Sequence, residues 1–316
     1  EKIMKIDDIK SIYQKILKEI QKVVVGKQDI LENLFIALLS EGHVLLEGVP
    51  GIAKTVMIKT FSRTLGCDFK RIQFTPDLLP ADITGTYIYR AHTSDFVLRK
   101  GPIFTNILLA DEINRAPPKT QAALLESMQE RQVTIEGNTY LMPNPSIVMA
   151  TQNPIEQEGT YPLPEAQVDR FQMRLLVEYP TRSEEKQILR LFNKKYNEDH
   201  EDILAVTDPT SIIDMQHKAK EIFVEEDIID YITDIVFYTR ENANVLLGGS
   251  PRASIALLKT SKVKAMIHGR DYVIPDDIKE LTPHILNHRV ILTPEAELEG
   301  LKPLDIINEA LETVWI

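Results

Sequence analysis

HVLLEGVPGIAKT, residues 43–55, is the most informative segment of the chain. Its apolar run Val44–Leu46 predicts a buried strand, the glycines and proline that follow predict a turn, and Lys54 and Thr55 open a helix. This order is typical of the phosphate-binding loop of nucleotide hydrolases. Loop N–H groups and the positive end of the helix bind phosphate, the lysine ammonium adds charge, and the threonine hydroxyl ligates Mg²⁺.

The predicted nucleotide-binding residues are this loop, the start of its helix and a segment just before them. The loop set is Gly48, Val49, Pro50, Gly51, Ile52, Ala53, Lys54, Thr55 and Val56. The usual pattern has glycine where this chain has Ala53, but a helix is already starting there and its backbone angles accept a methyl group. For Val25 and Gly26, two interpretations stay open: a core segment ending in a turn, or a contact to adenine.

Composition indicates an ordinary globular protein. The 316 residues are 43% hydrophobic and 26% charged, enough for one large or two ordinary domains. No apolar run reaches the length of a membrane span, and no signal peptide is visible. The single cysteine, Cys67, is expected to be a buried thiol. We therefore expect a cytoplasmic protein.

The net charge is −11. Because phosphate contacts require a basic surface, this charge argues against broad nucleic-acid binding, although it does not exclude a basic pore inside a ring.

The second strong signal is NILLADE, residues 106–112. Four apolar residues predict a buried parallel strand with two carboxylates at its C-terminal end. Ligands of open α/β sheets bind beyond the strand C-termini, so Asp111 is placed to hold the Mg²⁺ shell through water. Glu112 is placed to polarise an attacking water molecule.

Three later motifs also carry candidate residues. SIVMAT, residues 146–151, predicts another buried strand, and Asn153 follows at its tip, either as a turn residue or as a contact to the γ-phosphate. LPEAQVDRF, residues 163–171, contains Asp169 and Arg170. GGSPRAS, residues 248–254, places Arg252 in the first turn of a helix, where a cation is unfavourable unless it serves an anion.

The alternation of strands and helices predicts an α/β fold with a parallel sheet flanked by helices, followed by a smaller helical domain. The first domain is expected over residues 1–181, with β-hairpin insertions at about 84–100 and 132–142. After the break at 179–183, the chain is expected to be all-helical over 182–316. The helices of that half are predicted at 183–193, 210–220, 225–242, 252–268, 275–286 and 303–314.

These motifs, in this order, resemble the MoxR group of AAA+ ATPases over residues 20–290. GVPGIAKT is similar to that group's phosphate loop, including Ala53, and LLADEINRAPPKTQAALLESMQE is similar to its metal and water-activating segment. The resemblance implies ATP or ADP and Mg²⁺ as ligands, with Lys54 and Thr55 on phosphate and metal. It also implies Asp111 as metal ligand and Glu112 as catalytic base.

The resemblance further implies roles for the later motifs. Asn153 corresponds to the sensor-1 residue, Arg170 to an arginine finger that reaches a neighbouring subunit, and Arg252 to the sensor-2 residue of the lid, in cis or in trans. A homo-oligomer, with a hexameric ring as the active state, is implied. So are protein clients and a partner with a von Willebrand A-type domain.

From the residues alone, no second arginine close to Lys54 is expected to neutralise the γ-phosphate in cis, which makes oligomerisation part of activity. The preferred hypothesis is an ATP-driven, chaperone-like remodelling motor, with maturation or metal-cofactor insertion as its outcome. The first alternative is a nucleic-acid-stimulated translocase like the MCM helicases, because Arg90, Arg99 and Lys100 lie on the first hairpin. The second is a nucleotide switch of low turnover.

Overall fold

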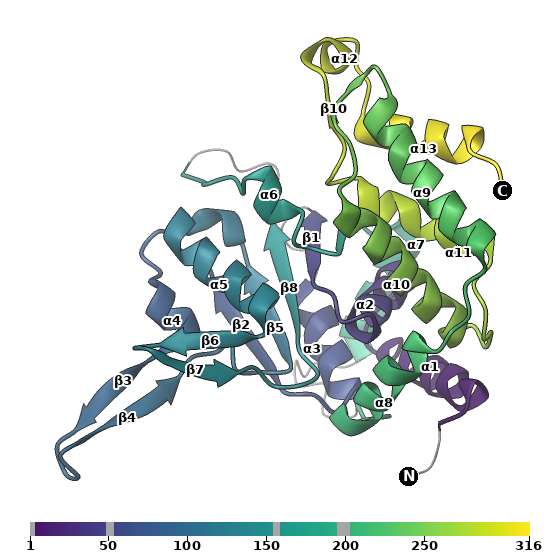
Figure 1. Ribbon diagram of the computed structural model, residues 1–316. Coiled ribbons are helices and arrows are strands. Elements are labelled where there is room, and N and C mark those ends of the chain that lie inside the picture. The colour runs from purple at the N-terminus through teal and green to yellow at the C-terminus, as the bar shows by residue number, and fades with distance from the viewer. Residues whose placement is uncertain (1–3, 49–53, 154–158, 195–202) are drawn as a thin grey trace.

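The computed structural model describes residues 4–48, 54–153, 159–194 and 203–316 (Figure 1). Its central element is a sheet of five parallel strands in the order β2-β5-β8-β1-β9. These strands are β1 (Val44–Gly48), β2 (Phe69–Gln73), β5 (Ile107–Asp111), β8 (Ile147–Gln152) and β9 (Met173–Val177). The predicted parallel α/β sheet is therefore confirmed.

The central strands β1, β5 and β8 each begin with three or four buried apolar residues because both faces of the sheet are covered. Val44, Leu46 and their neighbours on β5 and β8 point into a first core, which also receives helices from the second half of the chain. Leu45 and Leu108 point into a second core on the opposite face. The polar side chains of these two strands, Glu47 on β1 and Asp111 on β5, lie near or at the C-terminal ends, where burial is incomplete.

Helices α1 (Ile6–Ile20), α2 (Gln28–Leu39) and α3 (Lys54–Thr64) contribute buried residues to the first core. The second core lies under α4 (Pro80–Thr84) and α5 (Pro118–Glu130). A 3₁₀ turn, η1 (Ile113–Arg115), leads from β5 towards α5, and the short α6 (Glu165–Val168) precedes β9. In the segment LPEAQVDRF, residues 163–171, only the four residues of α6 are helical, and α4 ends just before the first hairpin begins.

Both predicted hairpins are present. Strands β3 (Gly85–Arg90) and β4 (Asp95–Lys100) form the first, and β6 (Gln132–Ile135) and β7 (Asn138–Leu141) form the second. Figure 1 shows the first hairpin projecting well beyond the body of the molecule. Its outer part carries an exposed aromatic pair, Tyr89 and Phe96, with ring centroids 5.4 Å apart.

The second half of the chain is mainly helical. Its helices are α7 (Arg182–Lys194), α8 (Pro209–Lys220), α9 (Glu226–Glu241), α10 (Pro251–Ile267), α11 (Pro275–Leu286), α12 (Pro294–Leu298) and α13 (Pro303–Thr313). A two-stranded antiparallel ribbon of β10 (Val245–Leu247) and β11 (Ile291–Leu292) adds to the predicted helices. These strands of three and two residues are too short to produce an alternation pattern in the sequence.

We propose that the division between the two domains falls between residues 181 and 182, where the sheet has ended and α7 begins. The first core nevertheless crosses this division, since Ile9 and Phe35 belong to the same buried cluster as Ile212 and Leu257.

Cys67 is buried, and burial raises the pKa of its thiol to about 12. Among the described residues, no helix combines the length and apolar character that crossing a bilayer requires.

Candidate active site

The candidate residues meet at one edge of the sheet. β8 lies between β5 and β1, so the C-terminal ends of these strands bring Gly48, Asp111 and Asn153 to the same edge. Asn153 is buried, with 8% of its surface exposed. The predicted loop residues Val49, Pro50, Gly51, Ile52 and Ala53 lie outside the described residues. Lys54, Thr55 and Val56 form the first turn of α3, as predicted.

Gly48 and Lys54 join the two ends of the predicted loop. A Cβ at Gly48 would lie 2.3 Å from the carbonyl oxygen of Val177, so the close packing of β1 against β9 requires glycine there. The Lys54 ammonium donates to the Gly48 carbonyl at 2.9 Å. Burial lowers the pKa of Lys54, and the negative charges of Asp111, Glu112 and Glu47 oppose that shift. The Lys54 ammonium therefore lies near the carboxylates at the C-terminal ends of β1 and β5.

Thr151 contacts both candidate acidic residues, through the carboxylate of Asp111 and the backbone of Glu112. Its buried hydroxyl donates to Asp111 Oδ1 at 2.5 Å and accepts from the backbone N–H of Glu112 at 2.8 Å. Glu112 has a left-handed backbone with φ 56°, which is uncommon for a residue with a side chain. The hydroxyl thus fixes both the metal-ligand candidate and the peptide of the candidate base. The adjacent strands β5 and β8 make this contact possible.

Two arginines and a glutamine engage the same carboxylates. Arg71, on the edge strand β2, donates from Nε and Nη2 to Asp111 Oδ2 at 3.1 and 2.6 Å. Gln73 Nε2 donates to Glu112 Oε2 at 2.7 Å, and Arg115 Nε lies 3.0 Å from the same oxygen. β2 pairs with β5 and so brings Arg71 to Asp111, although the two segments are far apart in sequence. The expectation that no second arginine neutralises the γ-phosphate in cis stays a prediction.

The donor set fits Mg²⁺ bound together with a nucleotide. Magnesium takes oxygen ligands and is usually held by one or two protein groups plus phosphates and water. Thr55 and Asp111 supply a hydroxyl and a carboxylate. Within the described part of the chain, no group of three or more His, Cys, Asp or Glu side chains is placed to hold a metal by itself. The metal would thus depend on phosphate ligands.

A cavity of about 540 Å³ lies beside this edge. It is lined by the start of α2, the end of β9 and the lid helix α11, and its walls include Gly26, Asn33, Tyr179 and His284. The volume suits a purine nucleoside. Gly26 has φ +67°, and a Cβ there would lie 2.0 Å from Glu184 Oε1. Val25 lines a neighbouring cavity of about 420 Å³ that shares Gly26.

Burial lowers the pKa of His284, the charge of Lys264 adds to the shift, and Asp29 opposes it. A neutral imidazole presents one donor and one acceptor, which matches the edge of a base.

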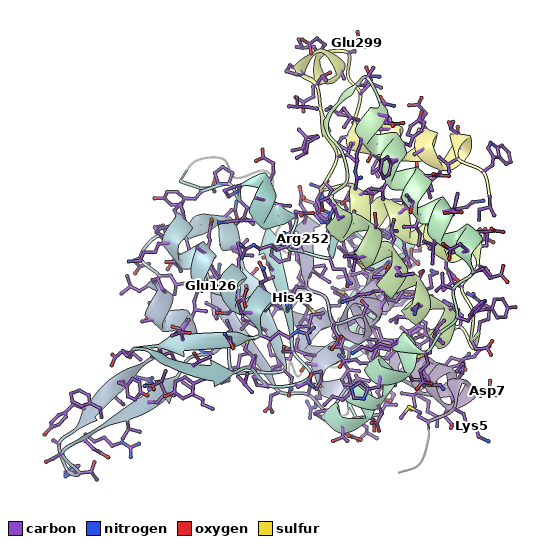
Figure 2. All side chains as sticks on the ribbon, viewed as in Figure 1. Lys5, Asp7, His43, Glu126, Arg252 and Glu299 are labelled. Carbon is purple, nitrogen blue, oxygen red and sulfur yellow. The ribbon has the colours of Figure 1, made fainter. Side chains whose placement is uncertain are left out.

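Both arginine candidates are close to Asp169: Arg170 is its neighbour in the sequence, and Arg252 contacts its side chain. Arg170 follows Asp169 directly, and its side chain has no hydrogen bond or ion pair with any described residue. Arg252 lies in the first turn of α10 and its Nη1 is 3.4 Å from Asp169 Oδ2. Figure 2 shows Arg252 where the start of α10 meets the sheet domain. The anion expected near Arg252 is, in this state, a carboxylate of the protein.

Sequence patterns miss several residues that the structure adds to the site. They are Arg71, Gln73, Arg115, Thr151, Tyr179, His284 and Arg289. Arg71 and Gln73 alternate with Ile72 on a strand, and that alternation was a usable signal for a polar face directed at the loop helix. The others depend on contacts between distant segments.

Comparisons with known proteins show which family the chain matches. The family model described as "ATPase family associated with various cellular activities (AAA)" matches residues 43–173, and the AAA lid domain model matches residues 238–310. The first range contains the loop, the two carboxylates, Asn153 and Arg170, and the second contains Arg252.

The chain is 47% identical to the chaperone MoxR1 of Mycobacterium tuberculosis, over 94% of this chain and 80% of that protein. It is 49% identical to the uncharacterized protein YeaC of Bacillus subtilis, over 98% and 96% of the two chains. A crystal structure from Cytophaga hutchinsonii, described as a candidate ATPase, superposes with a TM-score of 0.91 at 44% identity. That superposition covers 98% of this chain and 96% of the other.

Proposed function

This chain belongs to the MoxR group of AAA+ ATPases, and from that membership we propose that it hydrolyses ATP with Mg²⁺ in a ring of identical subunits to remodel other proteins. The observation that carries the proposal is the junction of Lys54, Asp111 and Glu112 at the C-terminal edge of the parallel sheet. Lys54 supplies a cation to bind phosphate, Asp111 a carboxylate to bind the metal, and Glu112 a carboxylate to activate water.

In this proposal the nucleotide lies between the loop and the lid. Gly48 to Val56 bind the phosphates, and the cavity beside Gly26, Tyr179 and His284 receives the base. Thr55 and Asp111 hold Mg²⁺, which would neutralise charge on the phosphates. Support comes from the oxygen-only donor set and from a cavity of nucleoside size.

Glu112 is the proposed base. Its carboxylate orients and polarises the attacking water, and Asn153 at the neighbouring strand tip contacts the γ-phosphate or that water. Thr151 fixes the Glu112 peptide, so the carboxylate starts from a defined backbone position. Gln73 and Arg115 hold Glu112 in this state and must release it before it acts on water.

We propose that Arg170 completes the site of a neighbouring subunit. Its side chain forms no hydrogen bond or ion pair with any described residue of its own chain, and an arginine supplied in trans typically raises hydrolysis by ~10³–10⁵-fold. A repeated head-to-tail contact of this kind closes into a ring, and a hexamer is the expected size. Arg252 would act as the sensor of the lid.

The proposed biological role is the maturation of protein partners. A relative named as a chaperone supports remodelling of proteins, and the projecting β3–β4 hairpin with its exposed Tyr89 and Phe96 provides a surface for a client. A partner with a von Willebrand A-type domain and the insertion of a metal cofactor are finer proposals that follow from the resemblance.

Phosphate release by Glu112→Gln tests the catalytic proposal. We expect hydrolysis to be abolished while Mg²⁺-dependent binding of a fluorescent ATP analogue persists, because the loop and the metal ligand are unchanged. Glu126→Gln, the same chemical change on the exposed face of α5, is the matched control and should behave like the parent. Full turnover by the Glu112 variant would refute the assignment.

The same assay separates the alternative functions. Stimulation by single-stranded DNA that weakens with salt would favour a translocase, and Arg90, Arg99 and Lys100 would then be its first candidates. Negligible turnover by the wild-type ring, with nucleotide binding intact, would favour the switch. We expect neither result.

A further inference from the structure

The carboxylate of Asp169 is held by three residues of the helical domain. Arg289 donates from Nε to Oδ1 at 2.7 Å, and the Ser250 hydroxyl donates to Oδ1 and Oδ2 at 2.9 and 3.1 Å. Arg252 adds a longer contact at 3.4 Å. Asp169 is the residue immediately before Arg170, so every one of these bonds acts one peptide away from the proposed arginine finger.

Arg289 is the fixed part of this contact. Its side chain is 3% exposed, and it also donates to the backbone carbonyls of Asp169, Phe171, Gln172 and Ile285. Burial lowers the pKa of Arg289, and the Asp169 carboxylate opposes that shift. A buried guanidinium needs such a counter-charge. The end of α11 and the connection before β9 therefore form one rigid unit.

Arg252 is the exchangeable part. Its side chain is 49% exposed and its contact with Asp169 is the longest of the set. If Arg252 turned towards an anion, Asp169 would keep Arg289 and Ser250 as partners. Moving the lid, in contrast, would pull on the connection through the buried bonds of Arg289.

We infer that Asp169 is a positioning residue that couples the lid of each subunit to the arginine finger that the same subunit offers to its neighbour. The inference rests on the proposed function, because it assumes that Arg170 acts in trans. Arg289 and Ser250 hold Asp169 on the lid, and Asp169 sets where Arg170 emerges. A change of lid position in one subunit would thus move the finger in the site of the next.

Mixed rings test this inference because they separate the subunit that gives the finger from the subunit that hydrolyses. An Arg170→Ala subunit has a site but no finger, and a Glu112→Gln subunit has a finger but no base. Mixing them should restore hydrolysis. Asp169→Asn is then placed in one or the other subunit, and phosphate release is measured at saturating ATP.

We expect Asp169→Asn to reduce the restored rate by on the order of 10²-fold when it is in the Glu112→Gln subunit, as a misplaced catalytic group does. In the Arg170→Ala subunit, the same substitution should leave the restored rate nearly unchanged. Equal effects in the two arrangements, or none in either, would overturn the positioning role. A purely structural defect would weaken both arrangements alike.

Folding of the Asp169 variant is checked by thermal unfolding and by nucleotide binding, which should remain near the parent value while kcat falls. Should Asp169→Asn fail to fold, Ser250→Ala replaces it, since this change removes two hydrogen bonds to Asp169 without stranding a charge. Ser250→Ala should also reduce the restored rate only when it is in the Glu112→Gln subunit, by a smaller factor than Asp169→Asn. If the parent mixture itself restores nothing, the trans role of Arg170 fails, and the inference about Asp169 falls with it.

Discussion

The guanidinium of Arg71 bonds to a single oxygen of Asp111, with Nε at 3.1 Å and Nη2 at 2.6 Å. Thr151 donates to the other oxygen, so both oxygens of this carboxylate already accept hydrogen bonds. Asp111 is the proposed magnesium ligand. A metal shell that uses Asp111 must therefore compete with Arg71, and nucleotide binding with Mg²⁺ includes the release of an ion pair.

Arg71→Ala should strengthen Mg²⁺-dependent nucleotide binding. A partly exposed ion pair is worth up to about 1 kcal/mol, so its removal should lower the Kd for Mg·ADP by about fivefold. Titration with a fluorescent ADP analogue at fixed Mg²⁺ measures this change. Lys70→Ala removes a cation from the same strand without touching Asp111 and serves as control. Weaker binding by the Arg71 variant would mean that Arg71 contacts the nucleotide itself.

Thr151→Val should lower the rate of hydrolysis at constant ATP affinity. Valine keeps the shape of the side chain but removes the hydroxyl that fixes Asp111 and the Glu112 peptide. We expect kcat to fall by roughly 10–100-fold and the free energy of unfolding to fall by about 1–3 kcal/mol, because the partly buried N–H of Glu112 loses its acceptor.

Thr64→Val is the matched control for Thr151. This buried threonine donates only to the Thr60 carbonyl within α3, so its loss changes stability without changing the two carboxylates. The outcome that contradicts the role of Thr151 is an equal loss of kcat in both variants.

Local sequence predicts the strands of this site better than it predicts which strands pair in the sheet. The runs before Gly48 and Asp111 identify two buried parallel strands, and ligand-binding residues follow such strands in chain order. Nothing in the local pattern states that β2 pairs with β5. Arg71 therefore reads as a solvated strand residue until the sheet order places it on Asp111.

The contacts of Asp169 show the same limit across domains. Its partners Ser250 and Arg289 lie more than eighty residues away on the helical domain. Asp169 is polar and stands near a turn, where carboxylates are common, so its pattern carries no information about a buried arginine. Arg289, in the segment NHRV, has the composition of an ordinary helix end. Only tertiary packing shows that its charge is buried.

Glu32 predicts a dependence of stability on pH. It joins Tyr13 of α1 to Lys264 and His268 of the lid, with bonds of 2.8, 3.0 and 3.2 Å. Burial by itself would raise the pKa of Glu32. The hydrogen bond from His268, the charge of Lys264 and the bond from Tyr13 outweigh burial and lower the pKa to about 2.

A carboxylate whose folded pKa lies below its unfolded pKa stabilises the protein above the unfolded value. That stabilisation should be present at pH 7 and should decrease as the pH falls from about 4.5 towards 2. We expect Glu32→Gln to cost about 2 kcal/mol at pH 7, after allowance for solvent screening, and less at pH 4.

Urea denaturation of the wild type and of Glu32→Gln at pH 7, 5 and 4 measures this difference in the free energy of unfolding. Glu280→Gln is the control, because Glu280 is an exposed partner of the same lysine and should contribute little. A gap between wild type and Glu32→Gln that stays constant down to pH 4 would contradict the assigned titration.

Gly26→Ala tests whether the cavity beside the sheet edge receives the nucleotide. The added Cβ would lie 2.0 Å from Glu184 Oε1, and φ +67° is unfavourable for alanine by roughly 1–2 kcal/mol. Residues 26–28 line the cavity, so their displacement should raise the Kd for ADP by at least about tenfold. Gly137→Ala imposes a similar backbone strain, with φ +84°, at a hairpin turn with open space around it. We expect the Gly137 variant to bind ADP like the parent, because Gly137 does not line the cavity and its backbone strain should not displace residues 26–28. Unchanged ADP affinity in the folded Gly26 variant would exclude this cavity as the base-binding site.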